Sequence, residues 1–491
     1  MNLVVVSNRL PFTLAREDGT WRVEPGSGGL VTALRPVLEG RGGRWIGWSG
    51  AVEEELPDAR AALQASGERF GYELVPVPLT ASERDRFYHG FSNEVIWPLF
   101  HDLVSRCRFD PDYWRSYEDV NRKFAAEAAR DARPGDFLWV HDYHLMAMAA
   151  ELRRLGVRSR IAFFLHIPFP PLDIFLKLPW RFPVLRSLLA YDLVGFQTIR
   201  DRRNFLQCVR LLLPGVRFSG KGAVLEVRWE GRDVRVGTFP ISIDVRSFER
   251  RAREPDVVAK AASLRADEPG RGIVLGVDRL DYTKGILQKL EAFRRLLETA
   301  PELRGQVTLF QIAVPSREEI PGYREHRTAI ERLVGEINGT FTRSGWVPVH
   351  YLHRPFEGPR LSAYYLAADV ALVTPLKDGM NLVAKEYCAT RVSKDGVLVL
   401  SEFAGAAAEL QRAALLVNPF DVEGVADALR RALEMPLTEQ RARMSRMRRT
   451  LRERDIYHWL DAFLRAAISS DLAQFPRVAD YLPPPVAFEV S

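Results

Sequence analysis

The chain contains 491 residues with a formal net charge of +6, and 47% of its residues are hydrophobic and 27% charged. This length is too great for one hydrophobic core and predicts two large domains or three small ones. The apolar runs are much shorter than the roughly 20 residues that a membrane helix needs. The first of them, residues 3–6, is also too short for the core of a signal peptide. We therefore expect a cytoplasmic protein that does not bind membranes.

The positive charge makes anionic ligands plausible but does not choose between nucleic acid and phosphorylated small molecules. The most basic stretch, residues 430–454, places Arg between Leu, Met and Glu at helical spacing. It lacks the aromatic platforms of a single-strand binder, so we interpret it as a solvated helix face and expect no nucleic-acid partner. Cys107, Cys208 and Cys388 are far apart and odd in number, which predicts free thiols.

The first half of the chain alternates short apolar strand patterns with helical patterns. The predicted strands are residues 3–6, 137–140, 161–165, 193–196 and 234–239, and a helix is expected over 145–155. Ligands of open α/β sheets bind at the carboxyl ends of the strands. Arg9, Asp142 and His166 follow three of these strands and are therefore candidate ligand-binding residues. A metal site made of His141, Asp142 and His144 is the less favoured interpretation, because neighbouring side chains point to different sides and no second cluster completes it.

Two further segments of this half have open interpretations. The glycine-rich residues 26–30 fit neither the dinucleotide-binding spacing nor the Walker pattern, which sets aside nicotinamide cofactors and P-loop chemistry. Residues 87–97 are rich in aromatic side chains with polar tips, as in a carbohydrate pocket. Buried Tyr and Trp give the same composition in any core, so both interpretations stay open.

The alternation of strands and helices restarts after the charged stretch 241–253, which predicts a domain crossing there. The expected strands are residues 273–277, 307–312, 370–373 and 397–400, with helices over 286–299 and 324–338 among them. Such alternation implies parallel sheets covered on both faces. The predicted fold class is therefore α/β, with two doubly wound Rossmann-like domains facing across a cleft.

Basic residues follow the strands of the second half. Arg279 and Lys284 straddle a turn that leads into a helix, which is a suitable place for two cations that bind a diphosphate. A structural salt bridge with Asp278 or Asp281 is the alternative. Arg317 repeats the pattern after the next strand.

Asp378 and Glu386 flank a predicted strand-to-helix turn, with a helix expected over residues 382–389. Gly379 can take backbone angles that other residues avoid and lets a ligand approach the main chain closely. The first helical N–H groups offer an anion site, so a nucleotide sugar would fit between the two acids. A capping acid followed by an ordinary surface Glu is the alternative.

Four segments, in this order, resemble the trehalose-6-phosphate synthase family, which comprises retaining glycosyltransferases of the GT-B fold. They are residues 139–144 (WVHDYH), 163–170 (FFLHIPFP), 279–285 (RLDYTKG) and 378–386 (DGMNLVAKE), and the resemblance runs from residue 4 to about residue 471. It implies transfer of glucose from a nucleotide-glucose, with UDP-glucose expected, to glucose 6-phosphate. The products would be α,α-trehalose 6-phosphate and the nucleoside diphosphate.

The resemblance also implies site residues. The donor would meet Gly28, Gly29, Arg279, Lys284, Phe356, Asp378, Leu382, Val383, Ala384, Lys385 and Glu386. The acceptor would meet Arg9, Tyr88, Trp97, Asp142 and Arg317, and the catalytic residues would be Arg279, Lys284, His166 and Asp378. The expected domains are residues 1–240 for the acceptor and 241–455 for the donor, then a helix (456–475) that returns to the first domain and an extended tail (476–491).

No cofactor and no metal site are expected, with stimulation by a divalent ion left open. Two other functions also stay open: a related transferase with another phosphorylated acceptor, such as a glucosylglycerol-phosphate synthase, and a catalytically silent sugar-phosphate sensor. The sequence does not choose the donor nucleobase among UDP, ADP and GDP. It likewise leaves open whether the chain forms a homo-oligomer, dimer or tetramer.

Overall fold

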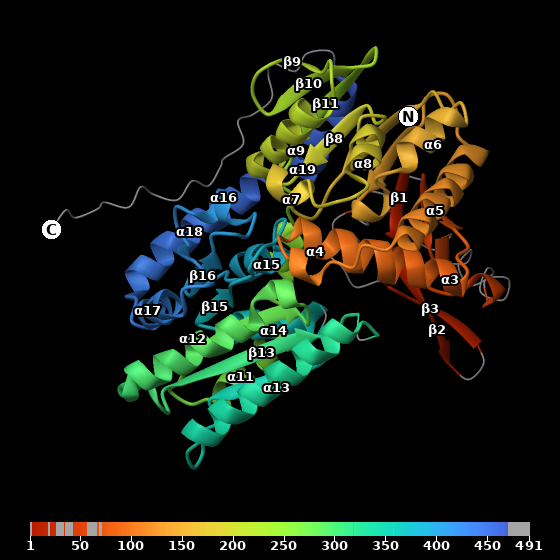
Figure 1. The fold of residues 1–491 in the computed structure, drawn as a ribbon. Coiled ribbons are helices and arrows are strands. Elements are labelled where there is room, and N and C mark those ends of the chain that lie inside the picture. Colours follow the sequence, from red (N-terminus) through yellow and green to blue (C-terminus); the bar gives the residue numbers. More distant parts are fainter. Residues whose placement is uncertain are drawn as a thin grey trace. The chain divides into compact units, whose positions relative to one another are not determined.

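The computed structural model of the chain describes residues 2–17, 20–25, 34, 43–55, 66–67, 71–317, 319–356 and 358–469 (Figure 1). Gly28 and Gly29, the predicted tail and the end of the predicted last helix lie outside the described residues. The chain forms two compact units. The N-terminal unit contains the described residues up to Pro240 and those from Trp459 on, and the C-terminal unit contains Ile241–His458.

The N-terminal unit is built on a nine-stranded sheet of order β5-β4-β1-β6-β7-β8-β11-β10-β9. The strands from β5 to β11 are parallel, and β10 and β9 extend the sheet as antiparallel neighbours. The bounds are β1 (Leu3–Arg9), β4 (Arg44–Trp48), β5 (Glu73–Pro76), β6 (Phe137–His141), β7 (Arg160–Phe164), β8 (Leu193–Phe196), β9 (Arg217–Ser219), β10 (Val224–Trp229) and β11 (Arg232–Thr238). A separate antiparallel hairpin pairs β2 (Phe12–Glu17) with β3 (Thr20–Pro25).

The helices of this unit include one of π type, η2, which follows the short α3. The main helical segments are α3 (Ala81–Glu83), η2 (Arg84–Ile96), α4 (Trp97–Phe100), α5 (Pro111–Arg130), η4 (Tyr143–Leu145), α6 (Met148–Arg154), α7 (Leu172–Phe175), α8 (Arg181–Leu188), α9 (Ile199–Leu212) and the last helix, α19 (Ile456–Ile468). From Trp459 on, α19 belongs to this unit, and the Phe463 ring stacks on Trp139 of β6 at 4.6 Å between centroids. A Cβ atom at Gly195 of β8 would lie 2.7 Å from the Phe463 ring, so α19 packs on β8 as well.

The C-terminal unit is a six-stranded, fully parallel sheet of order β14-β13-β12-β15-β16-β17. Its strands are β12 (Gly272–Arg279), β13 (Val307–Val314), β14 (Val349–Leu352), β15 (Val370–Val373), β16 (Val397–Ser401) and β17 (Leu415–Val417). Its α-helices are α10 (Val245–Arg251), α11 (Pro255–Ala266), α12 (Ile286–Thr299), α13 (Pro321–Phe341), α14 (Gly358–Ala367), α15 (Leu382–Thr390), α16 (Ala407–Leu410), α17 (Val422–Leu433) and α18 (Leu437–Glu453).

Apolar side chains of α12, α13 and α17 form one core with the strands, because each helix places its apolar residues three and four positions apart. Leu290, Phe293 and Ile337 are fully buried members of it. Helices α14 and α15 pack against each other and lie outside this core. Among the described residues, no helix is both long enough and apolar enough to cross a bilayer.

The predicted strands of both halves and the helix over 286–299 are confirmed. The single helix expected over 145–155 is wrong in detail, because the 3-10 turn η4 precedes a shorter α6. The prediction of a plain crossing at 241–253 missed α10, whose N-terminus is capped by Asp244.

Candidate functional site

Three candidate residues of the N-terminal unit lie at the carboxyl edge of neighbouring strands. Arg9 ends β1, Asp142 follows β6 and His166 follows β7. The Asp142 N–H donates to the Phe164 carbonyl at 2.8 Å, and its Oδ1 accepts from the His166 N–H at 3.1 Å. The backbone of Asp142 has φ 73° and ψ 168°, a conformation that costs about 1–3 kcal/mol and that these hydrogen bonds hold in place.

His166 forms a buried pair with His141, since His141 Nδ1 and His166 Nε2 are 3.1 Å apart. Burial lowers the pKa of His166 to about 3. Burial, together with the neighbouring His166, also lowers the pKa of His141. Both rings are therefore neutral near pH 7. His141 Nε2 is buried without a hydrogen-bond partner, so a proton on it would be a buried donor with no acceptor. The His141 proton is therefore placed on Nδ1, which donates to His166 Nε2. The His166 Nδ1–H then remains as a donor.

The Arg9 guanidinium lies over two aromatic rings. Its carbon is 3.8 Å from the Trp48 ring centroid and 5.5 Å from that of Tyr88. Burial lowers the pKa of Arg9, an effect that Tyr88 partly offsets, but an arginine stays charged. Gly50 has φ 99°, and a Cβ atom there would lie 2.4 Å from Arg9 Nη1. A glycine at this position therefore leaves room for the Arg9 side chain.

The two aromatic acceptor candidates differ in their access to solvent. Tyr88, on η2, is half-buried and stacks on His144, with centroids 5.9 Å apart and an angle of 16° between the rings. Trp97 is only 4% exposed and packs against His101 and Tyr143. Residues 87–97 thus combine core packing with one aromatic face close to Arg9.

In the C-terminal unit, the structure brings together Lys284 and Asp378, which are 94 positions apart in sequence. Lys284 Nζ lies 2.6 Å from Asp378 Oδ2, and the Lys284 side chain is 10% exposed. The Asn381 amide also donates to this carboxylate oxygen, at 3.2 Å. Gly285 is the N-cap of α12 and has φ 67°, and a Cβ atom there would meet the Thr374 carbonyl at 2.4 Å. The turn that positions Lys284 therefore needs a glycine.

Asp281 lies beneath this turn and is fully buried. It accepts hydrogen bonds from the N–H and hydroxyl of Thr283, and it forms an ion pair with Arg317 at 3.2 Å. Burial alone would raise the pKa of this carboxyl, but the charges of Arg317, Arg279 and Lys284 outweigh that cost and lower it. The guanidinium of Arg317 is thus committed to Asp281 and to the Tyr323 hydroxyl, whereas Arg279 is exposed.

The helix after Asp378 is α15, and its N-cap is Asn381. Asn381 accepts from the Ala384 N–H at 3.4 Å and has φ 73°, whereas Gly379 does not have a positive φ. The turn therefore does not use the freedom of Gly379 to adopt a positive φ, and Asn381, a residue type that tolerates the left-handed region, adopts it instead. The N–H groups of Leu382 and Val383, in the first turn, have no acceptor within the helix.

The remaining donor candidates are fixed by neighbours within the C-terminal unit. Lys385 is fully buried and binds Glu409 at 2.5 Å and the Ile241 carbonyl at 2.8 Å, so a ligand would meet only the backbone of this residue. Glu386 accepts from the Tyr365 hydroxyl at 2.8 Å, and burial raises its pKa, an effect that this hydrogen bond partly offsets. The Phe356 ring is largely buried, with the guanidinium groups of Arg354 and Arg360 at 4.8 and 4.7 Å.

Comparison with known proteins identifies the family. A sequence profile of glycosyltransferase family 20 matches residues 1–468. The chain belongs to glycosyltransferase family 20. A relative from Mycolicibacterium gilvum, a trehalose-6-phosphate synthase, is 46% identical to this family-20 chain over 476 residues, which cover 96% of this chain and 94% of the relative.

Solved structures agree with the assignment to family 20. An α,α-trehalose-phosphate synthase (UDP-forming) from Burkholderia xenovorans, in complex with glucose-6-phosphate, has a TM-score of 0.86 at 37% identity and covers 95% of this chain and 100% of that chain. An E. coli structure described as trehalose-6-phosphate bound with UDP-2-fluoro glucose has a TM-score of 0.84 at 37% identity and covers 95% and 99%. The chain is thus a glycosyltransferase of the trehalose-6-phosphate synthase family with the GT-B fold, and the predicted resemblance is confirmed.

Several residues that position the family-20 candidates were not predicted as site residues. The Asn381 cap could have been found, because Asn before a helix is a capping signal. His141 was considered only as a metal ligand and Asp281 only as a salt-bridge partner. Tyr365 has no sequence signal, because its contact with Glu386 joins residues 21 positions apart. Within the described ranges, no group of three or more His, Cys, Asp and Glu is placed to hold a metal ion.

Proposed function

We propose that this enzyme transfers glucose from UDP-glucose to glucose 6-phosphate with retention of configuration, giving α,α-trehalose 6-phosphate and UDP. The observation that carries the proposal is the pairing of Lys284 with Asp378 at 2.6 Å, directly before the N-terminus of α15. A cation, a carboxylate and free helix N–H groups then lie around one position, which suits a sugar joined to a diphosphate. The relatives described as UDP-forming and as bound with UDP-2-fluoro glucose support UDP-glucose as the donor.

The donor is held by the C-terminal unit. The N–H groups of Leu382 and Val383 bind the diphosphate together with Lys284 and the exposed Arg279. The backbone of Ala384 and Lys385 continues this surface, and Phe356 lies near the base. Gly28 and Gly29, which lie outside the described residues, remain predicted donor contacts.

Glu386 accepts hydrogen bonds from the ribose hydroxyls. Its second oxygen is available for this role, because the Tyr365 hydroxyl donates to Oε2. Burial raises the pKa of Glu386, and each hydrogen bond that a hydroxyl donates to its carboxylate favours the ionised form. The Tyr365 contact also fixes the rotamer of the side chain.

The acceptor is held by residues of the N-terminal unit. Arg9 binds the phosphate of glucose 6-phosphate as a charged, preorganised donor, because its side chain is held against Trp48. Tyr88 and Asp142 bind the sugar hydroxyls, and Trp97 supports them from its buried position. Arg317 has a side chain only 6% exposed and paired with Asp281, which favours a supporting electrostatic role over a direct contact.

In the proposed reaction, the anomeric hydroxyl of glucose 6-phosphate attacks C1 of the donor glucose on the face from which UDP leaves. The bond from C1 to the diphosphate oxygen breaks, the new C1–O bond forms on that same face, and the hydroxyl proton passes to the leaving phosphate oxygen. Arg279, Lys284 and the first N–H groups of α15 stabilise the charge on that phosphate.

Two side chains orient the donor glucose in this reaction. The Asp378 carboxylate is engaged by Lys284 and Asn381, which favours orienting a sugar hydroxyl over forming a covalent intermediate. His166 is neutral and presents its Nδ1–H as a second donor to the glucose. A neutral imidazole suits this role, because it supplies a hydrogen bond without adding charge.

A panel of substrates tests the proposal. Turnover is measured with UDP-, ADP- and GDP-glucose as donors and with glucose 6-phosphate and glycerol 3-phosphate as acceptors. The proposal predicts the highest kcat/KM with UDP-glucose and glucose 6-phosphate. Release of UDP with glycerol 3-phosphate but not with glucose 6-phosphate would refute the acceptor. Binding of the sugar phosphates without any turnover would instead support a silent sensor.

A further inference from the structure

The N-terminal unit has an arginine-lined cavity at the sheet edge opposite Arg9, Asp142 and His166. It lies where β7, β8 and β11 begin, and its volume is about 780 Å³. Five arginines and three carboxylates line it, so it has a formal excess of two positive charges. Its size is within the range of small-molecule sites.

Some of these arginines have structural roles. Arg153 donates to Asp192 at 2.6 Å, and Asp192 Oδ2 also accepts from the N–H of Ile161, which ties the start of β7 to β8. Arg160 and Arg235 donate to the carbonyls of Ala467 and Ala466 in the last turn of α19. The last carbonyls of a helix have no N–H donor within the helix, so these two arginines cap the C-terminus of α19.

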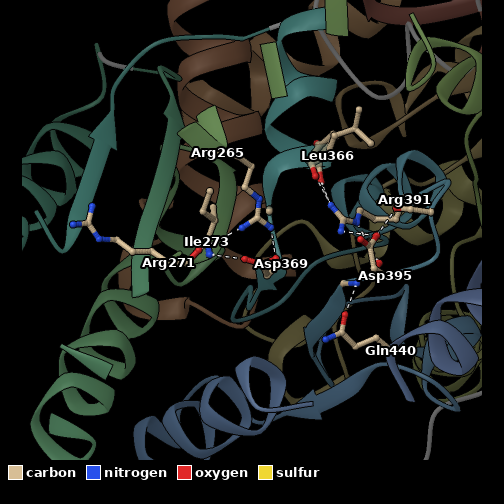
Figure 2. A network of polar contacts seen from close by, with 12 residues as sticks. Arg265, Arg271, Ile273, Leu366, Asp369, Arg391, Asp395 and Gln440 are labelled. Atoms are coloured by element: carbon tan, nitrogen blue, oxygen red, sulfur yellow. Dashed lines mark hydrogen bonds and ion pairs between the residues drawn. The ribbon is translucent and has the colours of Figure 1, made fainter. Parts of the chain in front are cut away.

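The C-terminal unit contains the same arrangement, an Asp–Arg pair that also binds the first N–H of a strand, without an excess of positive charge. Figure 2 shows that Asp369 accepts from the Ile273 N–H, at 2.8 Å, and pairs with Arg265. Asp192 makes the corresponding contacts with Ile161 and Arg153 in the N-terminal unit. The adjacent cavity, of about 500 Å³, is lined by two arginines and two carboxylates, so its charges balance. In the N-terminal unit, Asp192 also engages a second arginine, because Arg232 donates to Asp192 Oδ1 and to the Ala190 carbonyl, both at 3.1 Å. The balanced charges of the C-terminal cavity show that tying strand ends together does not itself require more arginines than carboxylates.

The surplus cations have donors to spare. Arg158 is exposed and has no ion-pair or hydrogen-bond partner within the part of the chain that the structure describes. The Nε atoms of Arg153 and Arg232 are buried without hydrogen-bond partners. Burial and the nearby Arg160 lower the pKa of Arg235, an effect that Glu226 and Asp192 partly offset, so Arg235 is partly desolvated and is repelled by Arg160. A bound anion would relieve both costs.

We propose that this arginine-lined cavity is a second anion-binding site that takes a small molecule carrying a phosphate or diphosphate group. Arg158 and Arg232 supply charge-assisted hydrogen bonds to the phosphate oxygens. The capping of α19 by Arg160 and Arg235 places the end of that helix at the wall of the site, so the ligand stabilises the folded N-terminal unit. The site is independent of the proposed transfer reaction.

Equilibrium dialysis of the full chain with radiolabelled pyrophosphate, at physiological ionic strength, tests the proposal. Arg158→Glu reverses one charge at the cavity without touching a structural contact. Arg232→Gln is a second variant, which also removes the contacts of Arg232 with Asp192 and the Ala190 carbonyl. Arg154→Glu is the matched control, because Arg154 is the exposed neighbour of Arg153, pairs with Glu151 and lies outside the cavity. Lys284→Ala removes a cation of the candidate donor site and thus separates the two classes of binding.

We expect Arg158→Glu to weaken pyrophosphate binding at one class of site by at least about tenfold. The loss of one hydrogen bond to a charged group is enough to lower an affinity by about that factor. Arg232→Gln should weaken the same class, Arg154→Glu should leave it unchanged, and it should persist in Lys284→Ala. Equal binding by Arg158→Glu and Arg154→Glu would overturn the proposal. Loss of all pyrophosphate binding in Lys284→Ala would overturn it as well, because the catalytic residues would then account for every bound anion.

Discussion

Replacing Lys284 with alanine is the perturbation that most directly separates catalysis from stability in this enzyme. Lys284 Nζ lies 2.6 Å from Asp378 Oδ2, with both side chains largely buried. A fixed donor aimed at charge that develops in a transition state contributes about 3–4 kcal/mol, so kcat should fall by about 10²- to 10³-fold.

The effect on stability should be smaller than for a fully buried ion pair. Breaking such a pair costs about 3–5 kcal/mol. Here the Asp378 side chain is 16% exposed and keeps the hydrogen bond from Asn381 at 3.2 Å. The free energy of unfolding should therefore fall by about 1–3 kcal/mol, the cost of one partly unsatisfied polar group.

The assay is UDP release at saturating substrates, together with denaturant unfolding of the same preparations. Lys260→Ala is the control, because Lys260 is an exposed lysine on α11 of the same unit. The double variant Lys284→Ala/Asp378→Asn also removes the negative charge of Asp378, which Lys284 no longer neutralises. It should regain stability without regaining turnover. Near-normal turnover of Lys284→Ala, or a double variant that recovers both properties, would refute the catalytic role of Lys284.

Three further predictions concern the remaining site residues. The pKa of His166 is about 3 in the folded state and about 6.5 in the unfolded state. Between these pH values only the unfolded state binds the proton, so the free energy of unfolding falls as pH is lowered from 6.5 toward 3. Between pH 7 and pH 5 the wild type should lose about 2 kcal/mol more than His166→Gln in denaturant unfolding, and equal losses would contradict the neutral ring. Gly50→Ala should displace Arg9 and lower kcat/KM for glucose 6-phosphate about tenfold, with the KM of the donor unchanged; equal effects on both substrates would argue against an acceptor role for Arg9. Glu386→Gln keeps the contact with Tyr365 but should raise the KM of UDP-glucose about tenfold in steady-state kinetics, and an unchanged KM would remove Glu386 from the ribose site.

The positions of nine buried strands could be predicted from local patterns, because buried parallel strands are short apolar runs between helical segments. Their order in the two sheets was not predicted. The antiparallel edge formed by β9 and β10 was not predicted. These two strands bury few side chains, since β9 has no buried residue and β10 buries only Val224 and Val227, so the stretch resembles a loop in sequence. The π-helix η2 was also missed, since no simple sequence period distinguishes it from an α-helix.

The candidate residues could be placed at strand ends from the sequence, but their partners could not. The pairing of Lys284 with Asp378 and the burial of Lys385 depend on tertiary contacts across 94 and 24 positions. Arg317 shows the same limit, because a basic residue after a strand gave no sign that a buried Asp281 already engages it. The sequence pattern therefore predicted which residues lie at the strand ends. Only the three-dimensional packing shows which of their side chains have hydrogen-bond donors left for a substrate.

The configuration of the product tests the central claim most directly. UDP-glucose labelled with ¹³C at C1 and unlabelled glucose 6-phosphate are incubated with the enzyme, and the product is analysed by NMR. Retention predicts that the labelled anomeric carbon is α-linked in α,α-trehalose 6-phosphate, with one UDP released for each molecule formed. A β-linked product, or UDP release without a disaccharide phosphate, would contradict the proposed reaction.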